Sequence, residues 1–404
     1  MLFCIRLIRE QANHMNRRNL EQHLDPAIAP KRILALDGGG LRGVMTVAFL
    51  KKIEDILRER TGAGANFRLS DYYDLIGGTS TGSIIAAGLA LGMSVDEIRN
   101  HYFELGDKIF KPGLFHLGIF VQQYDAGKVA AALKTIFGER TLGSSDFKTG
   151  LMIMSKRLDT GSPWPLTNNP KGLHFNQRAG DTGIANKDYP VWSVVRASTA
   201  APTYFDPEAI LIKAADPVSG AAAVQGEFVD GGVSTANNPA LQLVLTATVK
   251  GYGFGWEMGA DKLAVTSVGT GRANPALGLS SGLGSVAAAH AVKALKSVLD
   301  DCADLVECMM QWMSHSPTAR VLDRDLGSLE GSNIGASAWL SYLRYNVHFE
   351  PEWFSEHLQM SLSKEELDDL AKMDKPANMA RLEEIGKRAA DLMVDPDHFP
   401  RLEN

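Results

Sequence analysis

The sequence predicts an α/β fold: a three-layer sandwich in which helices flank a central, mostly parallel sheet, followed by a helical C-terminal tail. Strand and helix patterns alternate from Arg32 to Leu91, which is the arrangement of a parallel sheet covered by helices. Apolar strand patterns that end in glycines return at residues 227–232 and 262–271. The 404 residues are 45% hydrophobic and 22% charged, which is typical of a globular chain with a sizeable core.

The first strand and helix enclose a glycine-rich turn. Residues 32–36 are short and apolar, which predicts a buried strand, and residues 44–60 have the apolar spacing of a helix. Between them lies DGGGLRG, residues 37–43, which we call the glycine loop. Glycine adopts positive φ and has no Cβ, so this loop can turn sharply and bring its N–H groups close to an anion. The loop therefore predicts a pocket for a phosphate or for the negative oxygen of a transition state.

The alternation continues after the first helix. A strand is predicted within YYDLIGG, residues 72–78, and a helix follows at 83–92. Ser94 is expected to be the N-cap of a further helix over 95–110. Residues 160–189 are rich in Gly, Pro, Asn and Asp, which predicts long surface loops.

The last third of the chain is predicted to be largely helical. Residues 285–313 indicate one or two mostly apolar helices. Their end is expected to pack in the core and contains Met309, Met310, Trp312 and Met313. Ser363 and Glu366 form a capping-box pattern, and residues 378–393 are amphipathic, so the tail is expected to form helices.

Three segments are predicted: an N-terminal extension at 1–30, a catalytic unit at 31–350 and a helical extension at 351–404. The apolar start of the chain is broken by Arg6 and ended by Arg9, so it is too short to span a bilayer and too broken for a secretory signal. Three alternatives stay open for it: a short basic helix at a membrane surface, a frayed terminus, and a true start at Met15.

Charge and cysteine content exclude several function classes. A net charge of -6 gives no reason to expect nucleic acid, whose binders carry a basic face. Cys4, Cys302 and Cys308 are too few for a disulfide framework and lack the spacing of a zinc site. No EF-hand loop and no H-E-x-x-H motif occurs. We therefore expect a cytoplasmic protein without metal, cofactor or nucleic-acid partner.

A candidate nucleophile lies between the second predicted strand and its helix. Gly78 to Gly82 match G-x-S-x-G, which in this setting is typical of a nucleophile elbow, where small residues allow a strained turn that exposes the serine. Ser80 is expected at the N-terminus of the helix, whose positive end stabilises negative charge. A hydroxyl needs a base to accept its proton, so a partner for Ser80 must lie elsewhere in the chain.

Two kinds of base are available. Hydrolases with this elbow usually carry their histidine late in the chain. The late histidines are His290, His315, His348, His357 and His398. None has a persuasive setting, and His348, after a strand-like segment, has the best. Asp230 follows an apolar run and precedes two glycines, so its carboxylate could face the edge of the sheet where ligand sites gather.

Several motifs occur in a fixed order along the chain. They are DGGGLRG at 37–43, GTSTG at 78–82, ASTAAPTYF at 197–205, DGGV at 230–233 and, more weakly, SVGTG at 267–271. With these motifs the chain resembles the patatin-like phospholipases over roughly residues 31–350. No family motif is found beyond Glu350.

The resemblance implies a catalytic serine and aspartate without histidine, with Ser80 as the nucleophile and Asp230 as the general base. It implies an oxyanion hole made by the backbone N–H groups of Gly38, Gly39 and Gly40, where one donor contributes about 3 kcal/mol. A raised pKa of Asp230 would suit its role, and burial raises the pKa of a carboxyl group. The residues that support these motifs are Asp37, Arg42, Gly43, Gly78, Gly82, Gly231 and Gly232.

Other residues near the motifs have two interpretations each. Arg42 is either a structural clamp on the glycine loop or a charge near the oxyanion or a lipid phosphate. We favour the clamp, because a side chain after the glycines is expected to point away from the pocket. Pro202 is expected to shape the chain, and Tyr204 and Phe205 are either core residues or acyl-chain contacts.

The resemblance implies a lipid acyl hydrolase of the phospholipase A or lysophospholipase type. Its partners would be a phospholipid or other lipid ester, a membrane contacted transiently, and a regulatory ligand or a homo-oligomer, as in regulated membrane-degrading bacterial effectors. The alternative is a nucleotide-binding protein, because Gly38, Gly40 and Gly43 also fit G-x-G-x-x-G. The acidic partner of that motif belongs about 20 residues on, which here falls within a predicted helix and weakens the alternative.

Overall fold

The computed structural model describes residues 17–109, 124–177, 180, 183–202, 204–273, 286–322, 327–329, 331–332 and 334–399. Over 286–296 the description covers the backbone alone. The expectations for Cys4, Met15 and the rest of the first 16 residues lie outside the described residues. Among the helices of the described ranges, none combines the length and apolar character that crossing a bilayer requires.

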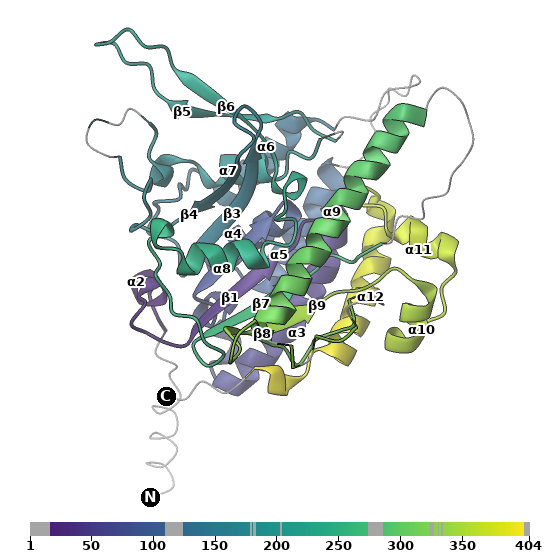
Figure 1. Cartoon of the computed structure of the whole chain (residues 1–404). Coiled ribbons are helices and arrows are strands. Elements are labelled where there is room, and N and C mark those ends of the chain that lie inside the picture. Colours follow the sequence, from purple (N-terminus) through teal and green to yellow (C-terminus); the bar gives the residue numbers. More distant parts are fainter. Residues whose placement is uncertain are drawn as a thin grey trace, which may run out of the picture.

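The described strands form one mixed sheet of nine strands in the order β5-β6-β3-β2-β1-β7-β9-β8, with β4 paired to β3 beside this path (Figure 1). The strands are β1 Lys31–Leu36, β2 Leu75–Thr79, β3 Gly150–Arg157, β4 Pro163–Thr167, β5 Glu208–Lys213, β6 Val224–Asp230, β7 Leu263–Val268, β8 Ser314–His315 and β9 Leu340–Tyr345. Pairing is parallel from β3 through β2, β1, β7 and β9 to β8, and antiparallel for β4, β5 and β6. The predicted α/β fold with a mostly parallel central sheet is confirmed.

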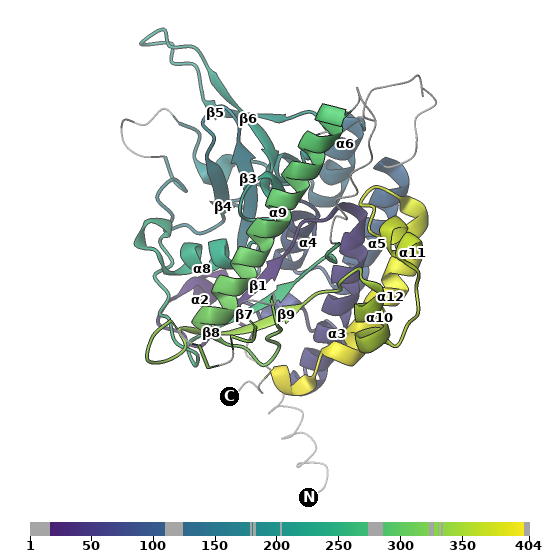
Figure 2. The same ribbon diagram turned by 45° about the vertical axis from the view of Figure 1, so that its right-hand side comes forward.

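Helices cover both faces of this sheet. The helices of the described ranges are α2 Leu20–Leu24, α3 Gly43–Thr61, α4 Thr81–Ala90, α5 Val95–Ile109, α6 Ala126–Phe137, α7 Val191–Ser198, α8 Ala240–Thr248, α9 Val286–Met313, α10 Pro351–Leu358, α11 Lys364–Leu370 and α12 Met379–Met393. Leu34 and Leu36 of β1 pack with α3, α4 and α5, whereas Ile33 and Ala35 pack with α8 and α9, because successive side chains of a strand point to opposite faces. Figures 1 and 2 show the resulting three layers.

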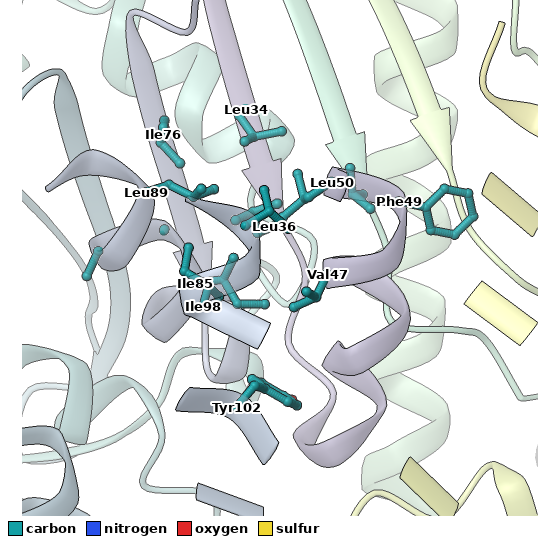
Figure 3. Packing of buried hydrophobic residues seen from close by; sticks show 14 of the residues in the cluster. Leu34, Leu36, Val47, Phe49, Leu50, Ile76, Ile85, Leu89, Ile98 and Tyr102 are labelled. Atoms are coloured by element: carbon teal, nitrogen blue, oxygen red, sulfur yellow. The ribbon is translucent and has the colours of Figure 1, made fainter. Parts of the chain in front are cut away.

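The larger core lies between the strands and helices that carry the motifs. Leu34, Leu36 and Ile76 point from β1 and β2 toward Leu50 of α3 and Leu89 of α4 (Figure 3). All five side chains are completely buried, and each contributes about 1.5–3 kcal/mol relative to an exposed position. This packing holds α3 and α4 against the strands that precede them, so the turns between strand and helix are well defined.

The C-terminal helices pack against the layer that contains α3. A Cβ on Gly386 of α12 would lie 2.8 Å from the Cα of Met45, so the glycine allows α12 and α3 to approach closely. Arg99 of α5 forms a two-pronged ion pair with Glu383 of α12, at 2.5 and 2.8 Å. The expected capping box is present, since Ser363 Oγ accepts a hydrogen bond from the amide of Glu366 in the first turn of α11, and the Glu366 carboxylate accepts one from the amide of Ser363. The amphipathic helix predicted over the tail is confirmed as α12.

Two sequence expectations are wrong in part. The loops expected over 160–189 contain β4, which begins at Pro163; proline lacks an N–H, and β4 tolerates it because it pairs on one side with β3 alone. The end of α9 is not uniformly core, since Met310 and Met313 are buried but Trp312 is 37% exposed. The domain boundaries placed at residues 30 and 350 stay a prediction.

Candidate active site

Ser80 and Asp230 meet beside β3. The last residue of β2, Thr79, pairs with Met154 of β3, and the last residue of β6, Asp230, pairs with Ser155, the next residue of β3. Because β4 pairs with the opposite side of β3 at both positions, β2 and β6 lie end to end along the same side of β3. The two strands run in opposite directions, so the residue that follows β2 faces the end of β6.

Ser80 has the backbone of a nucleophile elbow. Its φ is 53° and its ψ is -126°, a conformation that costs a non-glycine residue about 1–3 kcal/mol. The turn needs its glycines, because a Cβ on Gly78 would lie 2.1 Å from the carbonyl oxygen of Gly82, and a Cβ on Gly82 would lie 2.3 Å from that of Leu36. The amide of Ser80 donates to Ser198 Oγ at 2.9 Å. The serine is thereby held at the N-terminus of α4.

Asp230 is a buried carboxyl group with an altered pKa. The residue is 4% exposed, and its Oδ1 accepts a hydrogen bond from the amide of Gly232 at 2.7 Å. Burial raises the pKa of Asp230 to about 6, while the hydroxyl of Ser80, the amide of Gly232 and the guanidinium of Arg196 act in the opposite direction. Gly231 and Gly232 form the turn that follows β6. At neutral pH the group is mostly a carboxylate, yet it accepts a proton readily.

The glycine loop lies directly against the elbow. A Cβ on Gly38 would lie 3.0 Å from the Cβ of Ser80 and 2.5 Å from Asn237 Oδ1, so a side chain at this position would crowd both residues. The amide of Gly38 donates to the carbonyl oxygen of Asn237 at 3.1 Å and is therefore occupied. The amides of Gly39 and Gly40 donate to no acceptor within the described ranges. Of the three donors expected from the sequence, these two have N–H groups left for an anion.

Side chains from other elements hold the carbonyl groups of the loop. Thr270 Oγ1 donates to the carbonyl oxygen of Gly38 at 2.7 Å, and the hydroxyl of Tyr102 donates to that of Gly40. Tyr102 in turn lies 2.5 Å from Thr81 Oγ1, at the start of α4. The loop is thus tied to α5 and to the helix that follows the elbow. Neither contact was predicted: Thr270 lies in the weak SVGTG motif and Tyr102 in a predicted helix, and nothing local to either residue indicates contact with the glycine loop.

The C-terminal segment also contacts the loop. The amide of Leu41 donates to the carbonyl oxygen of Met373 at 2.7 Å. Gly40 has a φ of +58°, and a Cβ there would lie 2.4 Å from the same oxygen. The segment between α11 and α12 therefore forms part of the site, which no local signal in the tail indicated.

Asp37, which opens the loop, is paired with a residue that the sequence reasoning missed. Arg344 Nη1 and Nη2 donate to its two carboxylate oxygens at 3.0 and 2.7 Å. Both residues are buried, at 5% and 7% exposure. Gly43 closes the loop at the start of α3, where a Cβ would lie 2.4 Å from the Tyr102 hydroxyl oxygen.

The expected orientation of Arg42 is wrong. Arg42 lines the cavity that contains Ser80, and its guanidinium lies 5.8 Å from the ring centroid of Phe349. Burial lowers the pKa of Arg42 to about 10, against the influence of Asp300 and of two tyrosines that also line the cavity. Its buried Nε has no hydrogen-bond partner within the described residues. Within the described residues, the Arg42 side chain adds a cation to the cavity wall and makes no hydrogen bond that would clamp the loop.

The cavity has a volume of about 640 Å³ and contains Ser80, Asp230 and the three glycines in its wall. One group of lining residues is apolar or aromatic: Ile84, Leu105, Ile109, Val129, Tyr204 and Phe205. Another group is charged: Arg42, Arg272, Asp300, Asp304, Lys372 and Asp374. Phe205 satisfies both interpretations made for it, since it belongs to the core and also lines the cavity with Pro202. The cavity can hold an apolar chain beside a polar group.

No described histidine lines this cavity. His348 is buried, and burial lowers its pKa to about 3, so its ring is neutral at pH 7 and packs against Trp353. The other late histidines also lie elsewhere, at exposed or half-buried positions: His315, His357 and His398. The side chain of His290 lies outside the described residues. Asp230 is therefore the base candidate that the fold brings to Ser80.

Neither a cluster of metal ligands nor the acidic residue of a dinucleotide site is found where it would be expected among the described residues. Across the described ranges, no group of three or more His, Cys, Asp or Glu side chains is arranged to hold a metal ion. The position about 20 residues after the glycine loop lies within α3, as predicted, and the second strand leads to Ser80 instead of the acidic residue that a dinucleotide site requires.

Known proteins share the segment that contains these motifs. A family model described as patatin-like phospholipase matches residues 34–244, slightly more than half of the chain. A cGAMP-activated phospholipase of Vibrio cholerae serotype O1 (strain ATCC 39315 / El Tor Inaba N16961) is 32% identical over 218 residues, covering 52% of this chain and 55% of that protein.

Two further relatives have similar coverage. Patatin-17 of Solanum cardiophyllum is 30% identical over 226 residues, which is 54% of this chain and 53% of that protein. A cUMP-AMP-activated phospholipase of Escherichia coli is 32% identical over 222 residues, which is 54% of this chain and 59% of that protein. The chain thus spans little more than half the length of the curated relatives it matches.

Proposed function

Since the chain belongs to the patatin-like phospholipase family, we propose that it is a lipid acyl hydrolase that cleaves carboxylic esters through an acyl-Ser80 intermediate. The observation that carries the proposal is the meeting of Ser80 and Asp230 in one cavity, beside the glycine loop. Together they offer what acyl transfer needs: a nucleophile, a base, and N–H donors for the developing negative charge.

In the first half of the reaction, Ser80 Oγ attacks the ester carbonyl carbon while the Asp230 carboxylate accepts the hydroxyl proton. The carbonyl oxygen becomes negative and is stabilised by the amides of Gly39 and Gly40, where one such donor contributes about 3 kcal/mol. The carbon–oxygen bond of the ester then breaks, and Asp230 returns the proton to the leaving alcohol. The product of this half is an acyl ester of Ser80.

In the second half, a water molecule attacks the acyl-serine carbonyl and Asp230 accepts its proton. The same amides stabilise the second tetrahedral intermediate, and the fatty acid leaves as Ser80 regains its proton from Asp230. One carboxyl group acts first as base and then as acid in each half. A pKa of about 6 suits this double role, because both protonation states are accessible near neutral pH.

The lining of the cavity suits a substrate ester that joins an apolar chain to a phosphate-bearing headgroup. Ile84 lies one helical turn after Ser80 and, with Val129, belongs to the apolar lining suited to an acyl chain. Arg42 is positively charged, and its Nε has no hydrogen-bond partner among the described residues; this favours the second of its two interpretations, a charge near the oxyanion or a lipid phosphate, and we propose the phosphate. We therefore propose phospholipase A or lysophospholipase activity over hydrolysis of triacylglycerols, which lack the phosphate.

The test compares wild type with Ser80→Ala and Asp230→Ala on mixed phospholipid vesicles and on a short-chain soluble ester. Wild type is expected to cleave both, and each variant to lose at least about a thousandfold in kcat. Ser219→Ala is the matched control, because Ser219 is exposed, pairs with Asp216 and does not line the cavity. Substantial turnover by folded Ser80→Ala would refute the proposed mechanism.

We also propose that the activity is restrained until a regulatory ligand binds or copies of the chain associate at a membrane. Two bacterial relatives are named for activation by cGAMP and by cUMP-AMP. The hydrogen bond from Leu41 to Met373 gives the C-terminal helices a direct route to the glycine loop. Vesicle hydrolysis measured with and without each of these nucleotides tests the idea, and full activity without any added factor would exclude a strict requirement.

A further inference from the structure

The ion pair of Asp37 and Arg344 spans three adjacent strands at the edge of the sheet where Ser80 lies. Asp37 follows Leu36, the last residue of β1, which pairs with Val268 of β7. Arg344 lies on β9 and pairs with Ser267 of β7. The guanidinium thus reaches over β7 to the first residue of the glycine loop, and this connection depends on the register of all three strands.

The guanidinium is held in one orientation. Besides its two bonds to Asp37, Nη1 donates to Ser267 Oγ at 2.8 Å, and Nε lies 3.8 Å from a carboxylate oxygen of Glu307 on α9. Burial alone would lower the pKa of Arg344, but the carboxylate of Asp37 raises it above its usual value, so the group stays charged. A planar, two-pronged donor fixes the direction of the carboxylate as well as its distance.

Stability alone is a poor explanation for this pair. Removing two charges from water costs several kcal/mol each, and buried ion pairs are often no more stabilising than well-packed apolar side chains. The location of this pair offers a different reason. Within the described residues, Arg344 is the one side chain that donates to the Asp37 carboxylate, and Asp37 stands two residues before Gly39, the first free amide of the loop.

We propose that Arg344 is a positioning residue: by holding both oxygens of Asp37, it sets the direction in which the amides of Gly39 and Gly40 point. The inference rests on the proposed function, in which those amides stabilise the oxyanion. Preorganised donors act in the transition state more than in the bound substrate, so a tilted loop lowers kcat more than it raises KM. A displacement of about 1 Å in such a site costs about a hundredfold in rate.

The decisive variant is Arg344→Lys, which retains the charge but cannot donate two parallel hydrogen bonds to one carboxylate. We expect kcat on the soluble ester to fall about 10- to 100-fold, with KM within about threefold of wild type. Arg320→Gln is the matched control. Arg320 pairs with Glu307 at 2.7 and 3.1 Å in the same charge cluster, but it neither contacts Asp37 nor lines the cavity.

A milder variant, Ser267→Ala, removes the bond that orients Nη1, together with a longer bond of 3.4 Å from Ser267 Oγ to Asn238 Oδ1, without changing any charge; a kcat loss of about three- to tenfold is expected. It decides the question if Arg344→Lys does not fold. Melting temperatures are measured for every variant, so that kcat is compared between folded proteins.

Wild-type kcat in folded Arg344→Lys, or in Ser267→Ala, would overturn the inference, and so would an equal loss of kcat in Arg320→Gln. Ser80→Ala in the same assay distinguishes failure of the proposed function from failure of the positioning role. Wild-type turnover that does not depend on Ser80 refutes the proposed function itself, whereas Ser80-dependent turnover that is insensitive to Arg344 refutes the positioning role alone.

Discussion

Replacing Asp230 by asparagine should make the protein more stable while it removes activity. Asparagine has almost the same shape, and its Oδ1 can still accept the amide of Gly232 that lies 2.7 Å from the carboxylate. What the change removes is a negative charge that burial disfavours. The carboxyl group that we propose as the base therefore costs stability in the free protein, as is common where a proposed function requires an unfavourable group.

The magnitude follows from the pKa of this group. Folding raises the pKa of Asp230 from 3.8 to about 6. A tenfold change in a proton equilibrium corresponds to about 1.4 kcal/mol, so the folded protein loses about 3 kcal/mol relative to Asp230→Asn once the carboxyl group is ionised in both states. Because the folded pKa lies above the unfolded one, the loss is absent below the unfolded pKa and develops as pH rises through about 4 to 6.

The assay is urea denaturation of wild type and Asp230→Asn, followed by tryptophan fluorescence, at several pH values between about 4 and 8. All other titrating groups are shared, so the difference in free energy of unfolding isolates this one. The variant is expected to gain about 2 kcal/mol on wild type between the ends of the range, because the unfolded carboxyl group is already more than half ionised at pH 4. A difference that does not change with pH, or a variant that loses stability relative to wild type as pH rises, would refute the assignment of the raised pKa to burial of Asp230.

The remaining predictions concern the rate and the substrate. The logarithm of kcat/KM should rise with pH at a slope of one and level off near pH 6, because Asp230 must be ionised to accept the proton of the nucleophile; a flat profile from about pH 5 to 7 would contradict this. Gly40→Ala should lower kcat at least about tenfold and reduce stability by about 1–3 kcal/mol, since its φ is positive and its new Cβ would lie 2.4 Å from a carbonyl oxygen of the C-terminal segment. Gly64→Ala has a similar φ of +64° but no neighbour within 4 Å, so the same kinetic and melting measurements should show a stability loss with wild-type kcat. Tyr102→Phe should lower kcat about three- to tenfold by removing a donor to the glycine loop, and unchanged steady-state kinetics would count against that contact. Val129→Trp should shift the preference among soluble esters toward shorter acyl chains, and an unaltered chain-length profile would show that the apolar lining does not hold the acyl group.

Much of the fold and the central residues of the candidate site could be read from local pattern. Apolar runs of strand length and helical spacing predicted β1 and α3, and Gly78 and Gly82 around Ser80 predicted a strained turn between β2 and α4. These features depend on residues that are adjacent in the sequence, so the conformational preferences of those residues predict them. β4 escaped prediction because the prolines near Pro163 are typical of loops, and its pairing with β3 depends on an edge that only the assembled sheet provides.

The sequence by itself determined which groups could do chemistry: a serine in an elbow, an aspartate after a strand, and a run of glycines with backbone N–H groups. Tertiary structure alone decided which of these groups lie together. The pairing of Thr79 and Asp230 with successive residues of β3 brings Ser80 and Asp230 to one point, and the amide of Gly38 is hydrogen-bonded to Asn237. Arg344 reaches the loop from more than 300 residues away. Local pattern cannot encode such contacts, because they depend on strand order and register, which are set by the packing of the whole sheet.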